Sequence, residues 1–503
     1  MMSLRALTLP ALSGIALWLS FPNVSLFPLV WFALVPFLGF CITEKSLRRV
    51  LIGHLVMGAI YFGGTLYWIL NVLTVYGKLD TAVSVGVFGL LIITQTAFLL
   101  PFTVLTTLTA RASPRAALWA APGFWILTEM LRTYFPFGGF PWASLGYSQL
   151  PYLWIVQIAD VGSVYLVSFL VVFASSAILA FWKWRSWSLA GVFMSLFLAA
   201  NLYGFYRVEV WTPEGSESLR AGLVQGVIEL SAPKEHYAER YFELLPHYFD
   251  QAVNQGARLV ILPEAQNPYF FPDDFYFRTF WERRVKAANA YLLFNSASFD
   301  ESGVPGYFNS AHLLDPEGKA VYRYDKNHLV PFGEYLPWAG ILGFAEALVA
   351  EVSGFKAGKG SEVGSLDDLK IGTLICYEAI FPELSREAVN KGANLLVNLT
   401  NDGWFGRTAA PSQHLQMAAF RCIENRKPML RAANSGYSAV IDSRGAVLAR
   451  TDLYKETLLV TEVEGNSVRT VFGVVGSWIC VAIIILSVGI FAAAGKRREG
   501  ANS

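Results

Sequence analysis

Charged side chains are nearly absent from the first part of the chain. Residues 1–206 carry 14 of the 77 Asp, Glu, Lys and Arg residues, whereas residues 207–469 carry 59 and residues 470–503 carry four. About 20 predominantly apolar residues are enough to cross a bilayer as a helix. The distribution therefore predicts a membrane domain of about seven helices at 1–206 and a soluble domain at 207–469. A transmembrane helix with a basic cytoplasmic tail follows at 470–503.

Eight apolar segments have a suitable length, and their flanks indicate an orientation. The predicted spans are 7–23, 25–42, 50–74, 82–109, 116–132, 151–182, 187–206 and 471–494. Basic residues follow every second span, and Lys and Arg are typical of cytoplasmic loops. We therefore expect both termini in the cytoplasm and the soluble domain on the outer side, which is the periplasm in a cell with an outer membrane.

Two acids and one loop interrupt the apolar part. Glu129 and Asp160 lie near span ends, where a carboxylate either serves a function or reaches toward water. The loop at 133–151 is rich in aromatic residues and glycine. This composition is typical of a segment at the membrane surface or of an aromatic belt.

The charge of the soluble part excludes one class of partner. Residues 207–469 hold 26 basic and 33 acidic side chains, although the whole chain has a formal net charge of +1. Nucleic-acid binding requires a basic surface, so we expect no nucleic-acid partner. The cysteines are also too few for a disulfide scaffold. They are Cys41, Cys376, Cys422 and Cys480.

The apolar pattern of the soluble part alternates between strands and helices. Strands are predicted at 219–228, 257–265, 291–299, 369–376 and 393–401, and helices at 236–256, 276–290, 381–392 and 413–427. Hairpins are predicted at 307–326 and 436–450. The pattern indicates sheets covered by helices, which is a layered α/β fold.

Three polar residues at strand ends have the chemistry of an acyl-transfer site. Cys376 precedes a predicted helix, whose dipole would lower the pKa of the thiol and whose Tyr377 N–H would face an oxyanion. Glu264 follows an apolar strand, where partial burial suits a general base. Lys326 follows another strand and would stabilise an oxyanion. Taken singly, a buried structural cysteine, a solvated acid and a solvated lysine are the more common cases.

The order of the motifs resembles the carbon–nitrogen hydrolase, or nitrilase, superfamily. The motifs LPE at 262–264, DKNHLVPFGE at 325–334 and CYE at 376–378 place their key residues 62 and 50 positions apart. Further motifs look like those of the apolipoprotein N-acyltransferase family, and with the arrangement of spans this resemblance covers nearly the full chain. They are FPWASLGYSQ, GLVQG, LVPFGEYLP, ICYEAIFPEL, NLTNDGWFG and QHLQMAAFR.

The resemblance implies a Glu–Lys–Cys triad on an extracytoplasmic αββα sandwich, attached to a multi-pass helical membrane domain. Cys376 would be the nucleophile, Glu264 the general base and Lys326 the oxyanion stabiliser. The supporting residues that it implies are Glu334, Tyr377 and Glu378.

The implied reaction is acyl transfer at a bacterial inner membrane. An acyl chain moves from a phospholipid, usually phosphatidylethanolamine, to the cysteine as a thioester. It then moves to the α-amino group of the diacylglyceryl-cysteine at the N-terminus of an apolipoprotein. No metal or organic cofactor is expected. Two alternatives stay open: a membrane-tethered amidase or nitrilase acting on a small amide, and a non-enzymatic transporter or scaffold. Eight spans favour a lipid substrate, because a tether needs only one.

Two stretches depart from simple expectations. The family tends to carry a tryptophan shortly after the GLVQG motif, where this chain has Lys234, and we assign no role to that lysine. The segment 336–355 is unusually apolar for a soluble domain. It is either a lid that admits acyl chains or a core helix.

Other polar residues near the motifs have structural interpretations. His414 either touches the site or packs against the core. A disulfide between Cys422 and Cys376 would remove the nucleophile, so we do not expect one. A structural role in a turn is expected for the polar residues around the end of the strand at 393–401. They are Asn398, Asn401, Asp402 and Trp404.

Overall fold

The computed structural model describes residues 4–213, 215–229, 234–264, 269–300, 306–337 and 354–502. The chain forms two compact units. Unit 1 consists of Met1–Thr212, Thr408–Gln416 and Thr470–Ser503, and unit 2 consists of Pro213–Arg407 and Met417–Arg469. The short segment 408–416 therefore belongs with unit 1, although the sequence around it has the pattern of the α/β fold.

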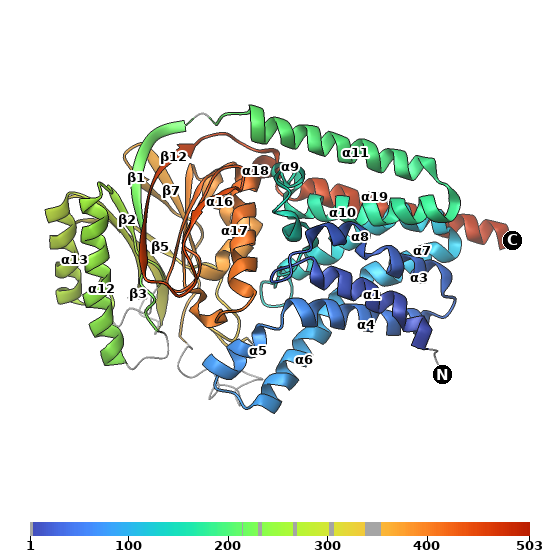
Figure 1. Cartoon of the computed structure of the whole chain (residues 1–503), viewed down its shortest axis with the longest axis horizontal. Helices are drawn as coiled ribbons and strands as arrows, with labels where there is room; N and C mark the ends of the chain where they lie inside the picture. Colours follow the sequence, from blue (N-terminus) through green and yellow to red (C-terminus); the bar gives the residue numbers. More distant parts are fainter. Residues whose placement is uncertain are drawn as a thin grey trace. The chain divides into compact units, whose positions relative to one another are not determined.

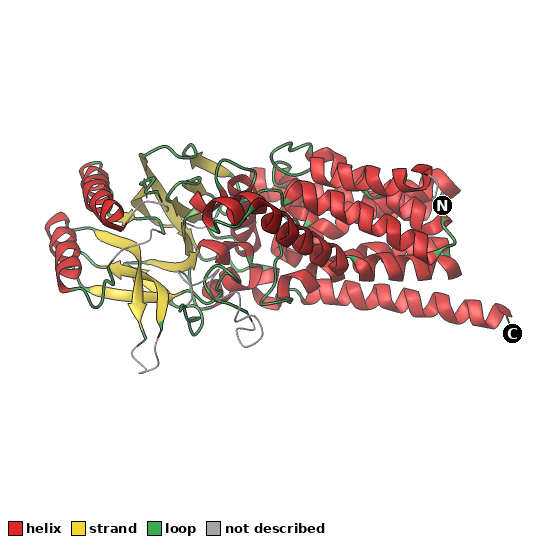
Figure 2. Ribbon diagram, turned by 90° about the horizontal axis from the view of Figure 1, so that it is seen from below, coloured by secondary structure: helices red, strands yellow, loops and turns green. Residues whose placement is uncertain are grey.

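Unit 1 is built of helices. They are α1 (Leu4–Leu19), α2 (Val30–Ala33), α3 (Val35–Thr43), α4 (Leu47–Thr65), α5 (Ile69–Asn71), α6 (Thr81–Phe98), α7 (Leu100–Ala112), α8 (Pro114–Tyr134), α9 (Leu153–Val156), α10 (Ala159–Trp184), α11 (Trp187–Phe205), α18 (Val471–Val475) and α19 (Trp478–Asn502). The long helices of this unit run side by side (Figures 1 and 2), and α8 packs against α7, α10 and α19. The last helix of the chain thus joins the helices formed by its first part.

Local sequence explains where some of these helices begin. Ser113 precedes α8 and accepts a hydrogen bond from the Ala116 N–H at 3.3 Å. Pro114 takes the first helical position, where a backbone N–H has no intrahelical partner. Asp80 caps α6 in the same way, by accepting a hydrogen bond from the Ala82 N–H at 2.8 Å.

Several of these helices are long and apolar enough to cross a membrane. Within the described residues, four segments meet this condition: Thr81–Ala112, Ala159–Trp184, Trp187–Val210 and Trp478–Arg497. A fifth is added if the bent pair Leu47–Thr65 and Ile69–Tyr76 forms one span. All of these lie where the sequence predicts spans. The number of eight predicted spans is not confirmed, because α1 and the helices at 27–43 are shorter and α8 is less apolar.

The two acids that the sequence places near span ends do not reach toward water. Glu129 is fully buried and accepts hydrogen bonds from the Trp125 indole and the Leu145 N–H, both at 2.8 Å. Asp160 is 2% exposed and pairs with Arg207 at 3.0 Å. Residues 141–149 of the loop at 133–151 are buried inside unit 1, and its place at the membrane surface stays a prediction. The bond from Leu145 shows one reason, since this loop satisfies a buried carboxylate.

Unit 2 contains two six-stranded sheets. The first sheet has the order β12-β1-β2-β3-β4-β5 and the second has the order β11-β10-β9-β8-β7-β6. The strands of the first sheet are β1 (Gly215–Gln225), β2 (Leu259–Ile261), β3 (Tyr291–Phe299), β4 (Tyr307–Leu314), β5 (Ala320–Asp325) and β12 (Thr457–Asn466). Those of the second are β6 (Val363–Leu366), β7 (Leu369–Ile375), β8 (Leu395–Thr400), β9 (Met429–Ala433), β10 (Ala439–Ile441) and β11 (Val447–Arg450). In each sheet, three neighbouring strands are parallel: β1-β2-β3 and β7-β8-β9.

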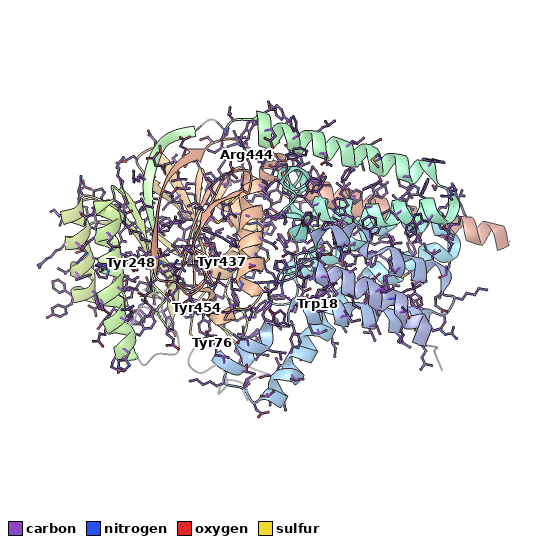
Figure 3. The ribbon with its side chains drawn as sticks, viewed as in Figure 1. Trp18, Tyr76, Tyr248, Tyr437, Arg444 and Tyr454 are labelled. Atoms are coloured by element: carbon purple, nitrogen blue, oxygen red, sulfur yellow. The ribbon has the colours of Figure 1, made fainter. Side chains whose placement is uncertain are left out.

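The two sheets face each other and are covered by helices. Apolar residues of both sheets form one core, with Leu223 and Leu293 from the first and Ile371 and Val397 from the second. A second core lies between the first sheet and helices α12 (Lys234–Asn254) and α13 (Phe275–Ala288). Helix α16 (Pro382–Asn390) packs against β7, and α17 (Ala410–Asn425) lies on the same side of the second sheet (Figure 1). Side chains fill the space between these layers (Figure 3). The predicted αββα sandwich is therefore present.

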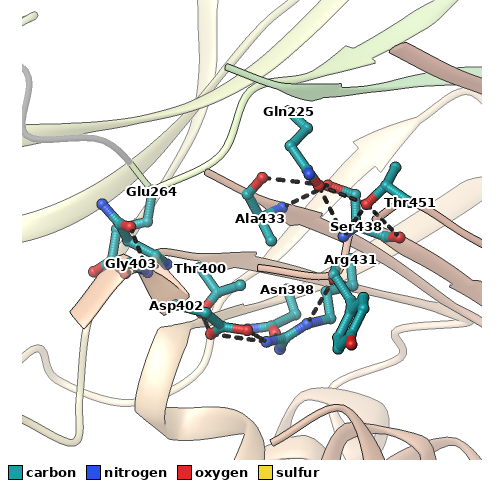
Figure 4. Close-up of polar contacts among 12 residues, drawn as sticks. Gln225, Glu264, Asn398, Thr400, Asp402, Gly403, Arg431, Ala433, Ser438 and Thr451 are labelled. Atoms are coloured by element: carbon teal, nitrogen blue, oxygen red, sulfur yellow. Dashed lines mark hydrogen bonds and ion pairs between the residues drawn. The ribbon is translucent and has the colours of Figure 1, made fainter. Parts of the chain in front are cut away.

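A buried polar contact also joins the two sheets. Gln225 lies at the end of β1, in the GLVQG motif. Its side-chain oxygen accepts hydrogen bonds from the hydroxyls of Ser438 at 2.8 Å and Thr451 at 2.6 Å, which belong to the region of β10 and β11. These contacts hold the end of β1 beside the second sheet (Figure 4).

Candidate functional site

Each residue of the predicted triad lies just beyond the carboxyl end of a strand. In the first sheet, Glu264 lies three residues after β2 and Lys326 directly follows β5. Cys376 directly follows β7 in the second sheet. Its φ of 51° lies in the left-handed region, which a residue with a side chain adopts only at a cost in free energy. Such strain often occurs at active sites.

Lys326 lies between two carboxylates. Its Nζ atom is 2.9 Å from Glu334 Oε1 and 3.8 Å from Glu264 Oε1, and the lysine side chain is 1% exposed. The Asn309 amide donates to the same two oxygens, at 3.0 Å to Glu264 and 3.1 Å to Glu334. The positive charge is thus held by side chains of one sheet. No group of three or more His, Cys, Asp and Glu side chains in the described ranges is placed to hold a metal ion.

The charges of this cluster act on one another. Burial lowers the pKa of Lys326, but the negative charges of Glu334 and Glu264 outweigh burial, so the net pKa shift is upward and the ammonium stays protonated. Burial raises the pKa of Glu264; Lys326 opposes this shift and the charge of Glu334 adds to it. A carboxylate with a raised pKa accepts a proton more readily, which suits a general base.

The Cys376 thiol sits in the same cluster. Burial raises the pKa of the thiol, the charge of Glu264 raises it further, and Lys326 lowers it. The prediction of a lowered pKa is therefore wrong, because Cys376 begins only a 3-10 helix of five residues, η6 (Cys376–Ile380), and burial dominates. The thiol hydrogen-bonds to Glu264. The thiol is therefore protonated near pH 7, with a carboxylate beside it.

Glu378 connects the segment that follows Lys326, here called the lysine loop, with the segment that begins at Cys376, here called the cysteine turn. Its carboxylate accepts four hydrogen bonds, from the Tyr324 hydroxyl at 2.8 Å and from the backbone N–H groups of Asn327 at 2.7 Å, His328 at 3.1 Å and Ile375 at 2.7 Å. Burial raises the pKa of Glu378 to about 7. This residue therefore connects the segment after β5 with the segment after β7, and so links the two sheets at the site.

Aromatic rings surround Tyr377. The Tyr377 ring centroid lies 5.1 Å from that of Phe381 and 5.9 Å from that of His328, and the last two are 3.8 Å apart. Burial and the neighbouring charge of Lys326 lower the pKa of His328 to about 4. This imidazole is therefore neutral near pH 7, and Lys326 stays the local cation.

Sequence reasoning missed two groups that contact Glu264. Asn309 lies in the middle of β4 and bonds Glu264, as described above. The Asn401 N–H donates to the other oxygen of Glu264, Oε2, at 3.1 Å. A buried amide in a strand is a usable signal for Asn309, because buried polar groups need hydrogen-bond partners. A backbone N–H carries no such signal, because every residue except proline has one.

The remaining predictions have mixed outcomes. Cys376 and Cys422 are both free and buried, so the expectation of no disulfide between them is confirmed. His414 is fully buried, and its ring lies 5.8 Å from that of Trp142 in unit 1, which confirms packing in a core. The Lys234 side chain and most of the apolar segment, residues 338–353, lie outside the described residues.

Comparisons with known proteins find relatives of both units. Residues 220–471 match the carbon–nitrogen hydrolase family, and residues 13–178 match the apolipoprotein N-acyltransferase N-terminal domain. The apolipoprotein N-acyltransferase of Geobacter metallireducens is 38% identical over 498 residues, which cover 95% of this chain and 94% of that protein. The enzyme of the same name from Nitrosomonas europaea is 32% identical and covers 87% of each chain.

Solved structures include an amidase of the nitrilase superfamily from Nesterenkonia sp. AN1, which is 22% identical. That match has a TM-score of 0.39 and covers 50% of this chain and 92% of the amidase. Family membership rests on the sequence matches, which extend over both units. On that evidence the chain belongs to the apolipoprotein N-acyltransferase family.

Proposed function

We propose that the protein transfers a fatty acyl chain from a phospholipid to the α-amino group of the N-terminal diacylglyceryl-cysteine of apolipoproteins. The transfer passes through a thioester on Cys376. One observation carries the assignment of the residues: a buried thiol, a carboxylate with a raised pKa and a buried ammonium converge from three strand ends. Family membership supports the choice of lipid and lipoprotein as donor and acceptor.

The first half-reaction forms the thioester. Glu264 takes the thiol proton as the Cys376 sulfur attacks the ester carbonyl of the phospholipid. The negative charge that develops on the carbonyl oxygen is stabilised by the Lys326 ammonium and, we expect, by the Tyr377 N–H. When the carbon–oxygen ester bond breaks, the lysophospholipid alkoxide takes the proton from Glu264.

The second half-reaction uses the same groups. The neutral α-amine of the acceptor attacks the thioester carbonyl, and Glu264 takes a proton from the attacking nitrogen. The carbon–sulfur bond then breaks, and the departing sulfur regains a proton from Glu264. Glu334 keeps Lys326 charged and in place in both halves, and Glu378 keeps the lysine loop beside the cysteine turn.

The two alternatives predict different products. A tethered amidase would use the same three residues on a small amide and release ammonia. A non-enzymatic transporter or scaffold has no need for a thiol hydrogen-bonded to a carboxylate beside a buried lysine. Phosphatidylethanolamine is the donor that the family resemblance favours, and a diacylated apolipoprotein is the acceptor.

Intact-protein mass spectrometry tests this proposal. The detergent-purified protein is incubated with phosphatidylethanolamine, beside Cys376→Ala and a matched Cys422→Ala variant, which also removes a buried thiol. We expect a fatty-acyl mass increment in wild type and Cys422→Ala but not in Cys376→Ala, and loss of the increment after a diacylated lipopeptide is added. No adduct, together with ammonia release from simple amides, would favour the amidase. Neither signal in a folded sample would favour the non-enzymatic alternative.

We also propose the membrane arrangement that the sequence predicts. Eight spans at 1–206 and 470–503 would place the domain at 207–469 on the periplasmic face of the inner membrane. The four long apolar segments and the basic exits of every second span support it.

Labelling with a membrane-impermeant maleimide tests this topology. The four native cysteines are buried, so they give little background. We expect Asp452→Cys, at a side chain that is 79% exposed in unit 2, to react in intact spheroplasts. Arg115→Cys, in a predicted cytoplasmic loop, should react only after permeabilisation. The reverse pattern would contradict the orientation.

A further inference from the structure

The turn after β8 contacts both the nucleophile and the general base. The Thr400 hydroxyl lies beside the Cys376 thiol. The next residue, Asn401, donates its N–H to Glu264 Oε2 at 3.1 Å. The positions of both reacting groups therefore depend on the placement of one short turn.

A fully buried ion pair holds this turn. Arg431 lies on β9, directly opposite Asn398 of β8 in the parallel register. Its Nη2 atom lies 3.0 and 2.8 Å from the two carboxylate oxygens of Asp402, and Nη1 donates to the Asn398 side chain (Figure 4). Both members of the pair have side chains that are 0% exposed. The planar guanidinium therefore binds the last part of β8 and the turn beyond it in a single geometry.

Further contacts fix the position of Asp402. Its Oδ1 atom accepts a hydrogen bond from the Thr400 hydroxyl at 3.1 Å, and the Thr400 oxygen in turn meets the thiol. A side chain at Gly436 would collide with Asp402, since a Cβ built there would lie 2.3 Å from Oδ2. The Tyr454 hydroxyl donates to the Gly403 carbonyl at 3.2 Å. The aspartate is thus enclosed on several sides.

We infer that Arg431 and Asp402 are positioning residues for acyl transfer, which hold the turn at 400–403 so that Asn401 meets the base and Thr400 meets the nucleophile. This inference rests on the proposed roles of Cys376 and Glu264. It gives the NLTNDGWFG motif a role beyond the shape of a turn. Neither residue needs to touch the lipid, because each acts through the backbone and side chains of the turn.

Three variants disturb the pair in different ways. Asp402→Asn removes the carboxylate charge, Arg431→Lys keeps a positive charge but loses the forked geometry, and Gly436→Ala keeps both charges and displaces Asp402. A matched control is Glu424→Gln. Glu424 pairs with Arg421 at 2.7 Å, and both are 0% exposed, so this control also neutralises a buried carboxylate beside an arginine. Glu424 lies on α17, away from the turn in sequence.

The first measurement is the single-turnover rate of Cys376 acylation by phosphatidylethanolamine. Misplacing reacting groups by about 1 Å can cost about 100-fold in rate. We expect Asp402→Asn and Gly436→Ala to lower the rate per folded molecule by about 10- to 100-fold, with the apparent KM for lipid within about twofold of wild type. The rate of Arg431→Lys should lie between the rates of these two variants and that of wild type. The rate of Glu424→Gln should equal that of wild type. A purely structural pair would lower thermal stability in all variants and leave the rate per folded molecule unchanged.

The second measurement needs no lipid. Alkylation of Cys376 by iodoacetamide is followed against pH in the full-length protein. The groups that face the thiol are Glu264, Lys326, Thr400 and Asp402, and the charge of Asp402 raises the pKa of the thiol. Asp402→Asn should therefore move the alkylation profile to lower pH, whereas Glu424→Gln should not move it.

The two measurements separate this inference from the proposed function. If wild type is never acylated, the proposed function fails, and the alkylation profiles still report whether Asp402 acts on the thiol. If wild type is acylated but Asp402→Asn and Gly436→Ala match it in rate and in profile, the inference is overturned. Gly436→Ala keeps the test valid even if Asp402→Asn does not fold.

Discussion

The two sheets of unit 2 hold their parts of the site by different means. The second sheet places Cys376 at the end of β7, inside the parallel group β7-β8-β9, where every residue of β8 and β9 is buried. In the first sheet, Glu264 follows β2, a strand of only three residues. Lys326 follows β5, which lies at the edge of that sheet. There, side-chain contacts with Asn309 and Glu334 add to a backbone hydrogen bond, which the Lys326 N–H donates to the Asn309 carbonyl at 2.8 Å.

The comparison shows a division of tasks. The parallel register places Cys376, the proposed nucleophile, among fully buried strands. A cluster of charges and amides surrounds Glu264 and Lys326, whose proposed roles depend on their protonation. Changes in the first sheet should therefore alter proton transfer, and changes around the second should alter stability and alignment.

The largest effect is expected from Glu264, the proposed general base, which lies in the first sheet. Glu264→Gln keeps the shape of the side chain but cannot accept the thiol proton. We expect thioester formation to slow by about 10²- to 10⁴-fold, the usual contribution of general acid–base catalysis. The single-turnover acylation rate measures this effect. Glu462→Gln, at a side chain on β12 that is 67% exposed, is the matched control and should react like wild type. A rate for Glu264→Gln within threefold of wild type would remove Glu264 from its role.

The next prediction concerns the pH dependence. The carboxylate of Glu264 must be ionised to accept a proton, so the wild-type rate should fall as the pH falls through its raised pKa. The charge of Glu334 contributes to that raised value. In Glu334→Gln, the pKa of Glu264 should drop, and the acidic limb of the pH–rate profile should move to lower pH. An unchanged limb, or one moved to higher pH, would mean that another group controls the rate.

A smaller effect is expected at the link between the sheets. In Glu378→Gln, the amide NH₂ would face backbone N–H donors, so at least one buried donor loses its acceptor. We expect a loss of about 1–3 kcal/mol of unfolding free energy, read as a lower Tm in detergent. Glu383→Gln, at a side chain that is 35% exposed and paired with Arg386, should change little.

The sign of the pH effect sharpens this test. The pKa of Glu378 in the folded protein is about 7, above its ordinary value of 4.5. Its contribution to stability is therefore full below about pH 4.5 and is lost as the pH rises through 7. Glu378→Gln should remove this pH dependence, and a difference in Tm that grows toward high pH would contradict the assignment.

The smallest effect is expected at the other buried thiol of unit 2. Cys422 is fully buried in α17, and its thiol donates to the Ala418 carbonyl at 3.7 Å. No carboxylate or lysine contact to it appears among the described residues comparable to that of Cys376. Cys422→Ala should acylate at the wild-type rate and lose about 1 kcal/mol or less of stability. A marked fall in the acylation rate would show that the Cys422 side chain on α17 affects the nucleophile.

Much of the fold follows from local patterns. The predicted strands at 291–299 and 369–376 correspond to β3 and β7, and the hairpin at 307–326 to β4 and β5. Apolar periodicity reports which face of an element is buried, so it is read from a short window. Such a window does not report tertiary burial. The composition of the loop at 133–151 gives no sign that Trp142 and Leu145 are buried inside unit 1.

The sequence by itself determines the family, the α/β pattern of residues 207–469 and the identities of Glu264, Lys326 and Cys376 as the residues to examine. Motif order along the chain carries that information. The tertiary structure alone decides how these residues act. The raised pKa of Cys376, the bridging amide of Asn309 and the pairing of Arg431 with Asp402 all arise between segments far apart in the chain. Burial and charge act through space, and the register of β8 and β9 is set by the whole sheet rather than by either strand.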